Sequence, residues 1–362
     1  MDARSYYYAD NSGLTVITTG VSVEQPVSRD VTANLRGVAD FIKVVRKPLA
    51  VEYQAGNQST GHHDADVVTS ASATAAGGEV AEKWRLEGIA GASARGEVLE
   101  LPSAVHAAVR AGTEPDYDSI SVNLGASTEL FQRNTAISVF GGYGRDTVSP
   151  VEAPPGQAAR WPASHDRIQG GFAVSQLLSP AVMISGGGGL TLQRGALENP
   201  YRRAIVRTSL FPEIVPDERD RFTAFASVSW YAGGGLAVHL RQGLYADSWG
   251  VLAAIPEIGL AEAVNRSLLV AGHYRFYTQA PAEFYQARYR DLQPILTGDA
   301  RLGRILGHLL GIEARWTFLG ERGGFGAMTA LASYEVSFLT YERLDTDEIV
   351  AHVPSLGLSA SY

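Results

Sequence analysis

The sequence contains no cysteine, which excludes disulfide bonds, zinc–thiolate sites and cysteine nucleophiles together. Charged residues are also scarce: they make up 19% of the 362 residues, against about a quarter in an ordinary soluble chain. The net charge is −8, so no basic surface is available to displace counterions from phosphates. We therefore expect no nucleic-acid partner, and the composition indicates no cofactor.

Segments that would direct or anchor the chain as a helix are missing too. The chain opens Met-Asp-Ala-Arg-Ser-Tyr-Tyr-Tyr without the basic and apolar regions of a secretory signal, so export requires a mature chain whose Met1 was left by processing or added. The longest uncharged stretch, Gly170–Gln193, is long enough to span a bilayer as a helix. It holds Ser179-Pro180 at its centre and the glycine run Gly186–Gly189, which disfavour a helix. The pattern favours two strands joined by a turn.

What the sequence does contain is a period of two. In Leu236–Asp247 the even positions are mostly leucine and valine, whereas the odd positions are mostly polar. The same alternation recurs in Val31–Phe41, Ile120–Leu130 and Leu268–Tyr277, and it is typical of strands with one apolar and one polar face. The polar faces mix Ser, Gly, Asn, Arg, His and Tyr, which fits a barrel lumen better than a soluble sheet. Aromatic residues on the apolar face near expected strand ends suit membrane-interface girdles: Tyr143, Trp230, Tyr274, Phe276, Trp316, Phe318, Tyr334 and Phe338.

The expected connections alternate in length, as they do in outer-membrane barrels, where short periplasmic turns alternate with longer extracellular loops. Short turns are expected near Pro26–Asp30, Arg95–Glu97, Phe131–Asn134, Leu178–Ala181, Ala232–Gly235, Ala263–Arg266 and Leu319–Gly324. Longer links are expected at Lys47–Gly78, Thr113–Asp118, Val148–Asp166, Gly195–Asp220, Asp247–Val251, Thr278–Ala300 and Arg343–Val350.

Parity sets the expected number of strands. The chain ends in an alternating strand that finishes on Tyr362. If this end is periplasmic, counting the strands backwards makes the Pro26–Asp30 turn periplasmic as well. An ascending strand must then precede Leu14–Gln25, and Ala3–Ala9 is the candidate. We predict an all-β fold: residues 1–362 form one transmembrane antiparallel up-and-down barrel of about sixteen strands, with fourteen or eighteen as alternatives. This fold places the chain in the bacterial outer membrane.

One block of the sequence resembles a known family. Residues 230–250 read Trp-Tyr-Ala-Gly-Gly-Gly-Leu-Ala-Val-His-Leu-Arg-Gln-Gly-Leu-Tyr-Ala-Asp-Ser-Trp-Gly, and residues 273–285 read His-Tyr-Arg-Phe-Tyr-Thr-Gln-Ala-Pro-Ala-Glu-Phe-Tyr. Further matching segments are Asp66–Ser72 with Glu82-Lys83, Glu114–Ser119 and Phe131–Thr135. This block resembles the bacterial outer-membrane family catalogued as domain of unknown function 3570. The resemblance covers most of the chain from Ser5 onward and departs from the family pattern at Ala246 and Ala282-Glu283. The resemblance implies an outer-membrane location and a barrel fold, and it leaves the activity open. It also suggests association with other envelope proteins.

Polar residues on lumen-face parity are the candidate pore lining. They could form a charged constriction or ligand track, or a ladder of salt bridges that only stiffens the wall. The candidates are Arg36, Asp40, His239, Arg241, Tyr245, Asp247, His273, Arg275, Tyr277, Glu313, Arg315 and Glu335.

Two other groups are weaker candidates. His62, His63, Asp64 and Asp66 offer imidazole and carboxylate ligands for a divalent metal, but neighbouring residues of an extended loop point in opposite directions, so we expect no metal site. Trp249, Gln279, Phe284 and Tyr285 lie on expected extracellular loops. They could line the pore or contact a partner, or they could anchor the loops at lipid headgroups.

Catalytic signatures are missing: there is no Gly-x-Ser-x-Gly, His-Glu-x-x-His or phosphate-binding Gly-Lys-Ser/Thr motif. We therefore expect no enzyme, although a hydrolase assembled on the outer wall stays a minor alternative. Two main alternatives remain: a pore or membrane component of an envelope or export complex, and a plugged barrel whose loops form a docking surface. Outer-membrane lipid and lipopolysaccharide are the expected surroundings, other envelope proteins are possible partners, and the sequence leaves the oligomeric state open.

Overall fold

A computed structural model describes residues 1–45, 80–151, 158–320, 326–342 and 348–361. These ranges contain β-strands and two short 3-10 helices, Ala158–Arg160 and Ala300–Leu302. No helix in this part of the chain is long and apolar enough to cross a membrane.

The strands follow the expected two-residue period. The barrel consists of β1 (Asp2–Asp10), β2 (Leu14–Pro26), β3 (Val31–Val45), β4 (Val80–Val98), β5 (Leu101–Glu114), β6 (Tyr117–Leu130), β7 (Thr135–Val148), β8 (Ala163–Ser179), β9 (Val182–Gly195), β12 (Glu218–Gly233), β13 (Leu236–Asp247), β14 (Leu252–Ala263), β15 (Leu268–Ala280), β16 (Ile305–Leu319), β17 (Met328–Tyr341) and β18 (Ile349–Ala360). A separate hairpin consists of β10 (Arg203–Val206) and β11 (Ser209–Pro212).

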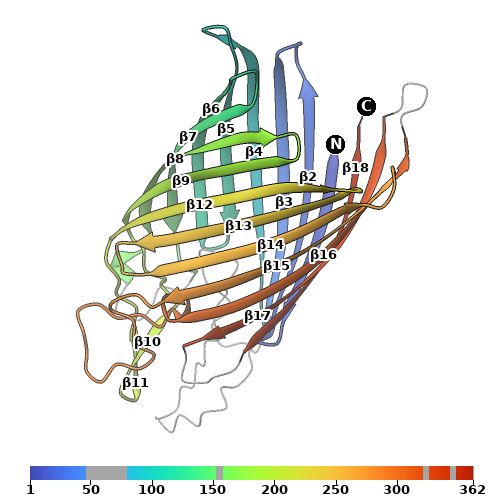
Figure 1. The fold of residues 1–362 in the computed structure, drawn as a ribbon. Helices are drawn as coiled ribbons and strands as arrows, with labels where there is room; N and C mark the ends of the chain where they lie inside the picture. Colours follow the sequence, from blue (N-terminus) through green and yellow to red (C-terminus); the bar gives the residue numbers. More distant parts are fainter. Residues whose placement is uncertain (46–79, 152–157, 321–325, 343–347, 362) are drawn as a thin grey trace.

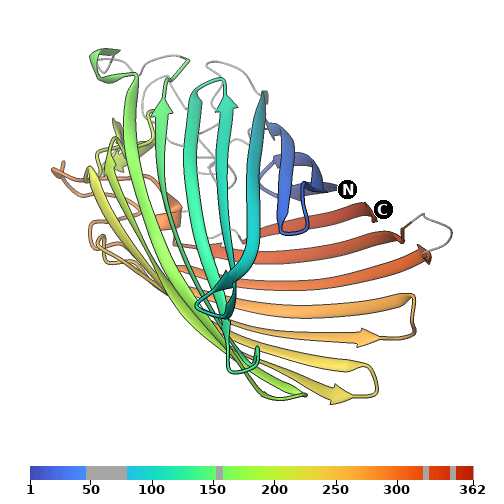
Figure 2. The ribbon, with the colours of Figure 1, turned by 90° about the horizontal axis from the view of Figure 1, so that it is seen from above.

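The sixteen barrel strands form one closed antiparallel sheet, as the sequence predicted (Figures 1 and 2). Each strand pairs with its neighbours in sequence, β9 pairs with β12, and β1 pairs with β18 to close the ring. The strand that parity required at Ala3–Ala9 is β1, where Ser5 lies opposite Leu356 on β18 and Thr19 on β2. Both termini therefore lie at the same end of the barrel.

The two ends of the barrel differ in their connections. We call the end with the links β3–β4, β7–β8, β9–β12 and β15–β16 the loop end, and the end with both termini the turn end. The link Lys47–Gly78 and the centre of Val148–Asp166 lie outside the described residues. The links predicted at Gly195–Asp220 and Thr278–Ala300 are 196–217 and 281–304, and the first carries β10 and β11.

Two predicted connections were placed wrongly. The turn expected at Arg95–Glu97 lies at Leu99-Glu100, because β4 stays extended to Val98 and both turn residues adopt positive φ. A hairpin turn of this kind usually contains Asn or Gly, and neither residue marks this one. The link expected at Thr113–Asp118 is only Pro115-Asp116, because Thr113 and Asp118 pair across the hairpin and their side chains hydrogen bond at 2.7 Å.

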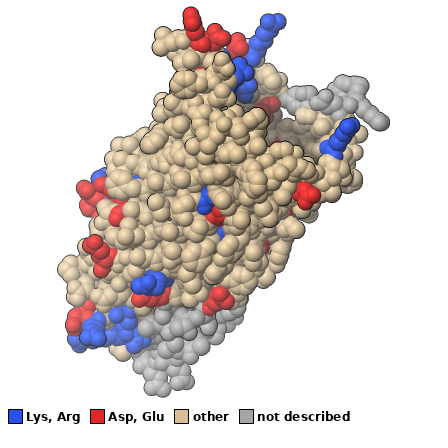
Figure 3. Space-filling view, in the orientation of Figure 1, with Lys and Arg blue, Asp and Glu red and all other residues tan. Residues whose placement is uncertain are grey.

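The outer face of the barrel is apolar. Most large exposed apolar side chains share the outward parity, for example Leu35, Trp84, Ile120, Leu244 and Leu356. Figure 3 shows such a surface: most Lys, Arg, Asp and Glu side chains gather toward the two ends, and the middle is largely free of them. An apolar band between polar ends is the surface that a bilayer requires of a barrel.

The opposite parity faces the lumen. Residues of this parity approach each other even when they are two strands apart, because side chains converge on the concave side of a curved sheet. His273 Nε2 on β15 lies 3.5 Å from Glu335 Oε1 on β17, and Gln169 Nε2 on β8 donates a 2.8 Å hydrogen bond to Asn123 Oδ1 on β6. The inner face is therefore the polar one.

Several of the expected girdle residues lie exposed on the outer face: Tyr143, Trp230, Trp316, Phe318 and Tyr334. Others contact histidines that share this face. Tyr274 and Phe276 pack on His308, and the Tyr274 hydroxyl lies 2.8 Å from His308 Nδ1.

Buried apolar clusters gather at the loop end. One consists of Leu14, Val16, Ile42 and Val44, with Tyr8 against it. Others join the links 196–217, 248–251 and 281–304 to the barrel rim. The packed interior of this barrel thus lies beneath its loops.

Candidate pore lining

The structure places the predicted lining residues on the inner face, at the positions their parity requires. His239, His273 and Glu335 fall in one hydrogen-bonded row across β13 to β17, separated by Gly259 and Gly311. A Cβ on Gly311 would lie 2.2 Å from His273 Cε1. The glycine thus lets the imidazole lie along the wall and reach Glu335 on the far strand.

Arg241 and Arg275 face the same carboxylate. Glu257 on β14 lies directly between them in register, and Arg275 Nε donates a 2.7 Å hydrogen bond to Glu257 Oε2. The Arg241 guanidinium lies 4.4 Å from the ring centre of Phe225. A similar packing explains one residue of the glycine run, because a Cβ on Gly187 would lie 2.8 Å from the Phe225 ring. Sequence reasoning missed Glu257, although Glu257 shares the inward parity of its strand.

Asp247 is the most highly connected residue of the predicted set. Its Oδ2 accepts hydrogen bonds from Arg219 Nε and from the Tyr245 hydroxyl, both at 2.8 Å. Its Oδ1 accepts from the backbone N–H groups of Trp249 and Val251, both at 3.0 Å. The carboxylate therefore holds the four-residue turn 248–251 and fixes a lumen arginine at the same time.

Arg36 and Asp40 lie on β3, several strands away from the other candidates, so the structure does not bring them into the same cluster. Asp40 is buried and lies 3.4 Å from Arg85 Nη1. Arg85 also contacts Glu87, which in turn pairs with Arg110.

A second ionic group adjoins this one at the loop end. Lys83 Nζ lies 2.7 Å from Glu114 Oε2 and 3.7 Å from Asp116 Oδ1, and all three side chains are buried. Burial of charged groups requires such pairing, because an unpaired charge in a low-dielectric interior is strongly unfavourable.

The remaining predicted residues make local contacts. The Tyr277 hydroxyl donates to Gln279 Oε1 at 2.5 Å, and Arg315 Nε donates to Glu313 Oε1 at 2.5 Å. Arg315 is 53% exposed, so it faces open space inside the barrel rather than a packed interior.

Sequence reasoning identified Arg36 but missed the row of arginines to which it belongs. Arg36, Arg110, Arg167 and Arg219 occupy one hydrogen-bonded row that runs across β3, β5, β8 and β12. We call these four residues the arginine row. Extending the parity argument from the strongly alternating strands to β5, β8 and β12 would have identified them.

The predicted loop residues pack into buried clusters of the links 196–217, 248–251 and 281–304, which we call the loop cluster. Trp249 is 6% exposed, lies edge-on to Phe284 with ring centres 5.4 Å apart, and donates its indole N–H to the Glu218 carbonyl at 2.8 Å. The interpretation of Trp249 as a lipid-headgroup anchor is therefore wrong, because the ring lies inside the protein. Gln279 Nε2 donates to the Arg301 and Gly303 carbonyls, a pairing that joins β15 to the end of link 281–304.

A buried ionic group stabilises the loops themselves. Arg202 Nη1 lies 3.0 Å from Asp299 Oδ2 and 3.4 Å from Glu213 Oε2. Burial opposes ionisation of Asp299, but the guanidinium groups of Arg202 and Arg301 outweigh it and hold the pKa of Asp299 well below its usual range. Tyr289 is fully buried beside this group, and burial raises the pKa of its hydroxyl.

A metal site finds no support in the described ranges. His62, His63, Asp64 and Asp66 lie outside them. Within them, no three His, Asp or Glu side chains are arranged to hold a metal ion.

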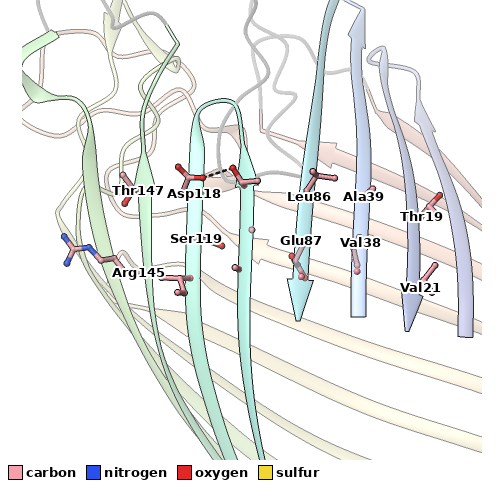
Figure 4. A pocket seen from close by; sticks show the side chains of 16 residues that line it. Thr19, Val21, Val38, Ala39, Leu86, Glu87, Asp118, Ser119, Arg145 and Thr147 are labelled. Carbon is pink, nitrogen blue, oxygen red and sulfur yellow. Dashed lines mark hydrogen bonds between the residues drawn. The ribbon is translucent and has the colours of Figure 1, made fainter. Parts of the chain in front are cut away.

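A groove on the outer wall is separate from the lining. Figure 4 shows its residues on β2 to β7, with the Thr113–Asp118 hydrogen bond dashed. The groove has a volume of about 900 Å³, and the small outward residues Gly37, Ala39 and Ala111 are among those that line it. None of the predicted lining residues contributes to it.

The closed sheet, apolar outer band and polar inner face define a bacterial outer-membrane β-barrel. The chain belongs to the family described as "Protein of unknown function (DUF3570)", whose model matches residues 1–337. No curated protein sequence matches the chain.

Several solved structures show weak similarity to the chain. A bacterial polysaccharide outer membrane secretin has 11% identity and a TM-score of 0.49, over 100% of this chain and 98% of its own. The outer membrane protein OpdK from Pseudomonas aeruginosa has 8% identity and a TM-score of 0.40, over 99% and 98%. The ferric enterobactin receptor PfeA from Pseudomonas aeruginosa has 9% identity and a TM-score of 0.46, over 94% of this chain and 53% of the receptor. The chain thus spans about half the length of that receptor.

Proposed function

We propose that this barrel is a water-filled pore of the bacterial outer membrane, acting alone or as the membrane component of an envelope complex. One observation carries the proposal: charged side chains of the inner wall remain in contact with solvent. Arg110 is 41% exposed, Arg275 45% and Arg315 53%, although all three point into the barrel. A sixteen-strand ring is wide enough for an aqueous lumen.

The pore narrows toward the loop end. Inner-face charges there are buried, as Asp40, Lys83, Asp146 and Asp247 illustrate, whereas the exposed arginines lie further along the wall. Buried apolar clusters that join the links 248–251 and 281–304 to the rim support a narrower opening at this end. We therefore expect the loop end to set the limiting conductance.

Planar-bilayer recording tests the pore directly. Purified, folded protein should give stable single-channel steps, and Arg275→Gln should change ion selectivity because Arg275 faces the lumen. Arg145→Gln is the matched control, since Arg145 lies on the outer wall and pairs with Asp166 at 3.5 Å. Persistent silence of the folded wild-type protein would refute the pore, and equal effects of the two substitutions would refute the role of Arg275.

The second candidate is a plugged barrel that docks other envelope proteins through its loops. The observation in its favour is the ordered loop cluster, in which Tyr289, Leu296 and Ala204 are almost fully buried. A rigid loop surface suits docking because little entropy is lost on binding. Silence in bilayers, together with specific co-purification of one envelope protein that is lost on Leu296→Ala, would favour this candidate.

An outer-wall hydrolase is not favoured. Ser229 Oγ lies 2.9 Å from His239 Nδ1, but this pair faces the lumen. In the described part of the chain no carboxylate contact is recorded for His239, which a Ser–His–carboxylate triad needs. The contact is explained as one of the cross-strand bonds of the wall.

A further inference from the structure

The arginine row concentrates positive charge on one strip of the inner wall. The residues that separate Arg36, Arg110, Arg167 and Arg219 in the row are uncharged: Ile89, Ser121, Gly144 and Gln193. Since hydrogen-bonded rows run perpendicular to the tilted strands of a barrel, the row crosses the wall as an inclined stripe. Neighbouring strands lie about 4.8 Å apart, so guanidinium groups recur roughly every 10 to 15 Å along it.

The nearby carboxylates neutralise this strip only in part. Glu87 pairs with Arg110, and Asp146 lies 3.4 Å from Arg167 Nη1, but both carboxylates lie one row closer to the loop end. Asp146 also pairs with His165 at 3.0 Å. Glu87 and Asp146 thus hold Arg110 and Arg167 from the loop-end side and leave their turn-end side positive. Arg219 differs, because its partner Asp247 lies one row toward the turn end, opposite Arg221.

Two further features leave guanidinium donors of this strip available. Arg36 is exposed, and among the described residues it forms no salt bridge. Arg221 follows Arg219 on the same strand face and lies opposite Asp247, the carboxylate that Arg219 already engages. The buried Nε of Arg221 donates no hydrogen bond among the described residues. Guanidinium groups with free donors are bidentate ligands for carboxylate and phosphate groups.

We infer that the arginine row, together with Arg221, binds extended polyanions inside the lumen: chains that carry carboxylate or phosphate groups at intervals. A single small anion would meet one guanidinium, whereas a chain lying along the stripe meets several in succession. The inference names polyanions as the substrate class of the proposed pore. Their transport rests on that proposed function. Binding itself needs only the folded barrel.

Titration calorimetry on the folded, detergent-solubilised protein tests the site without requiring conduction. A short linear polyphosphate and an oligogalacturonate serve as phosphate and carboxylate probes, and a neutral maltodextrin of similar length is the control ligand. We expect the anionic probes to bind and the neutral one not to bind. Binding of one anionic class alone would identify the source of the anion and support the site. Absence of binding by both would overturn it.

Variants separate the row from general charge effects. Arg221→Gln should weaken polyanion binding about tenfold, the loss of one charge-assisted pair, while Arg221→Lys should retain most of it. Arg145→Gln removes an arginine from the outer wall and should leave binding unchanged. Equal weakening by Arg145→Gln and Arg221→Gln would overturn the inference. Heat-modifiable gel migration checks that each variant has formed a closed barrel.

Bilayer recording then distinguishes the two proposals. Polyphosphate added to one side should block the wild-type current and block the Arg221→Gln channel more weakly. Binding without conduction would refute the pore and support the polyanion site. If the protein conducts, and polyphosphate neither binds to it nor blocks its current, the pore is supported and the polyanion site is overturned.

Discussion

Asp247 gives the sharpest test of how the lumen wall is stabilised. Its side chain is fully buried, and its two oxygens accept five hydrogen bonds: two from Arg219, one from the Tyr245 hydroxyl and two from the backbone of the turn 248–251. Replacement of Asp247 by Asn keeps one amide oxygen, which can still accept the backbone N–H groups of the turn. The new NH₂ group, however, would face the donors of Arg219 and Tyr245.

The expected cost follows from the burial of Arg219. Removing one partner of a buried ion pair costs about 3–5 kcal/mol, because the other charge is left without compensation. Arg219 is 13% exposed and keeps its contact with the Trp249 ring at 4.2 Å, which offsets part of this loss. We therefore expect Asp247→Asn to lower the free energy of unfolding by about 3 kcal/mol.

Asp220→Asn is the matched control on the outer face of the next strand. Asp220 accepts a 2.5 Å hydrogen bond from Arg194 Nη1, but both side chains are about one-third exposed or more, so its loss should cost under about 1 kcal/mol. The assay is urea unfolding of the barrel in phospholipid vesicles, followed by tryptophan fluorescence. Equal destabilisation by the two substitutions would show that burial of the Asp247 carboxylate adds nothing, and the reasoning would be wrong.

Three further perturbations test other parts of the structure. Gly311→Ala should displace the His273 ring and cost about 1–3 kcal/mol in the same unfolding assay, whereas Gly37→Ala, where a Cβ meets no atom within 4 Å, should cost far less. Tyr289→Phe removes two hydroxyl hydrogen bonds from the loop cluster and should speed tryptic cleavage of link 281–304 several-fold, with barrel folding unchanged. Asp299 has a lowered pKa, so its ionised form stabilises the loops above the unfolded-state value near 4, and this stability is lost as the pH falls through the folded-state pKa. Pepsin sensitivity of the loops should therefore rise below about pH 4, and Asp299→Asn should be sensitive at higher pH with a flatter pH dependence.

The sequence alone determined the architecture, since the physics behind it is local. Side chains alternate across a strand, so the period of two at Leu236–Asp247 assigned both a strand and its two faces. Strand parity then required Ala3–Ala9 to be a strand, and β1 confirms it. The same alternation placed the candidate lining residues on one face before any contact was known.

Tertiary structure decided which of those residues meet. The pattern of one strand does not determine its register with the next strand. Only the pairing shows that His239, His273 and Glu335 share a row, and that Glu257 lies between two arginines. The arginine row has the same origin, because it joins strands far apart in sequence whose own alternation is weak. The burial of Trp249 depends on the packing of separate links against one another, a long-range effect that no period in the sequence records.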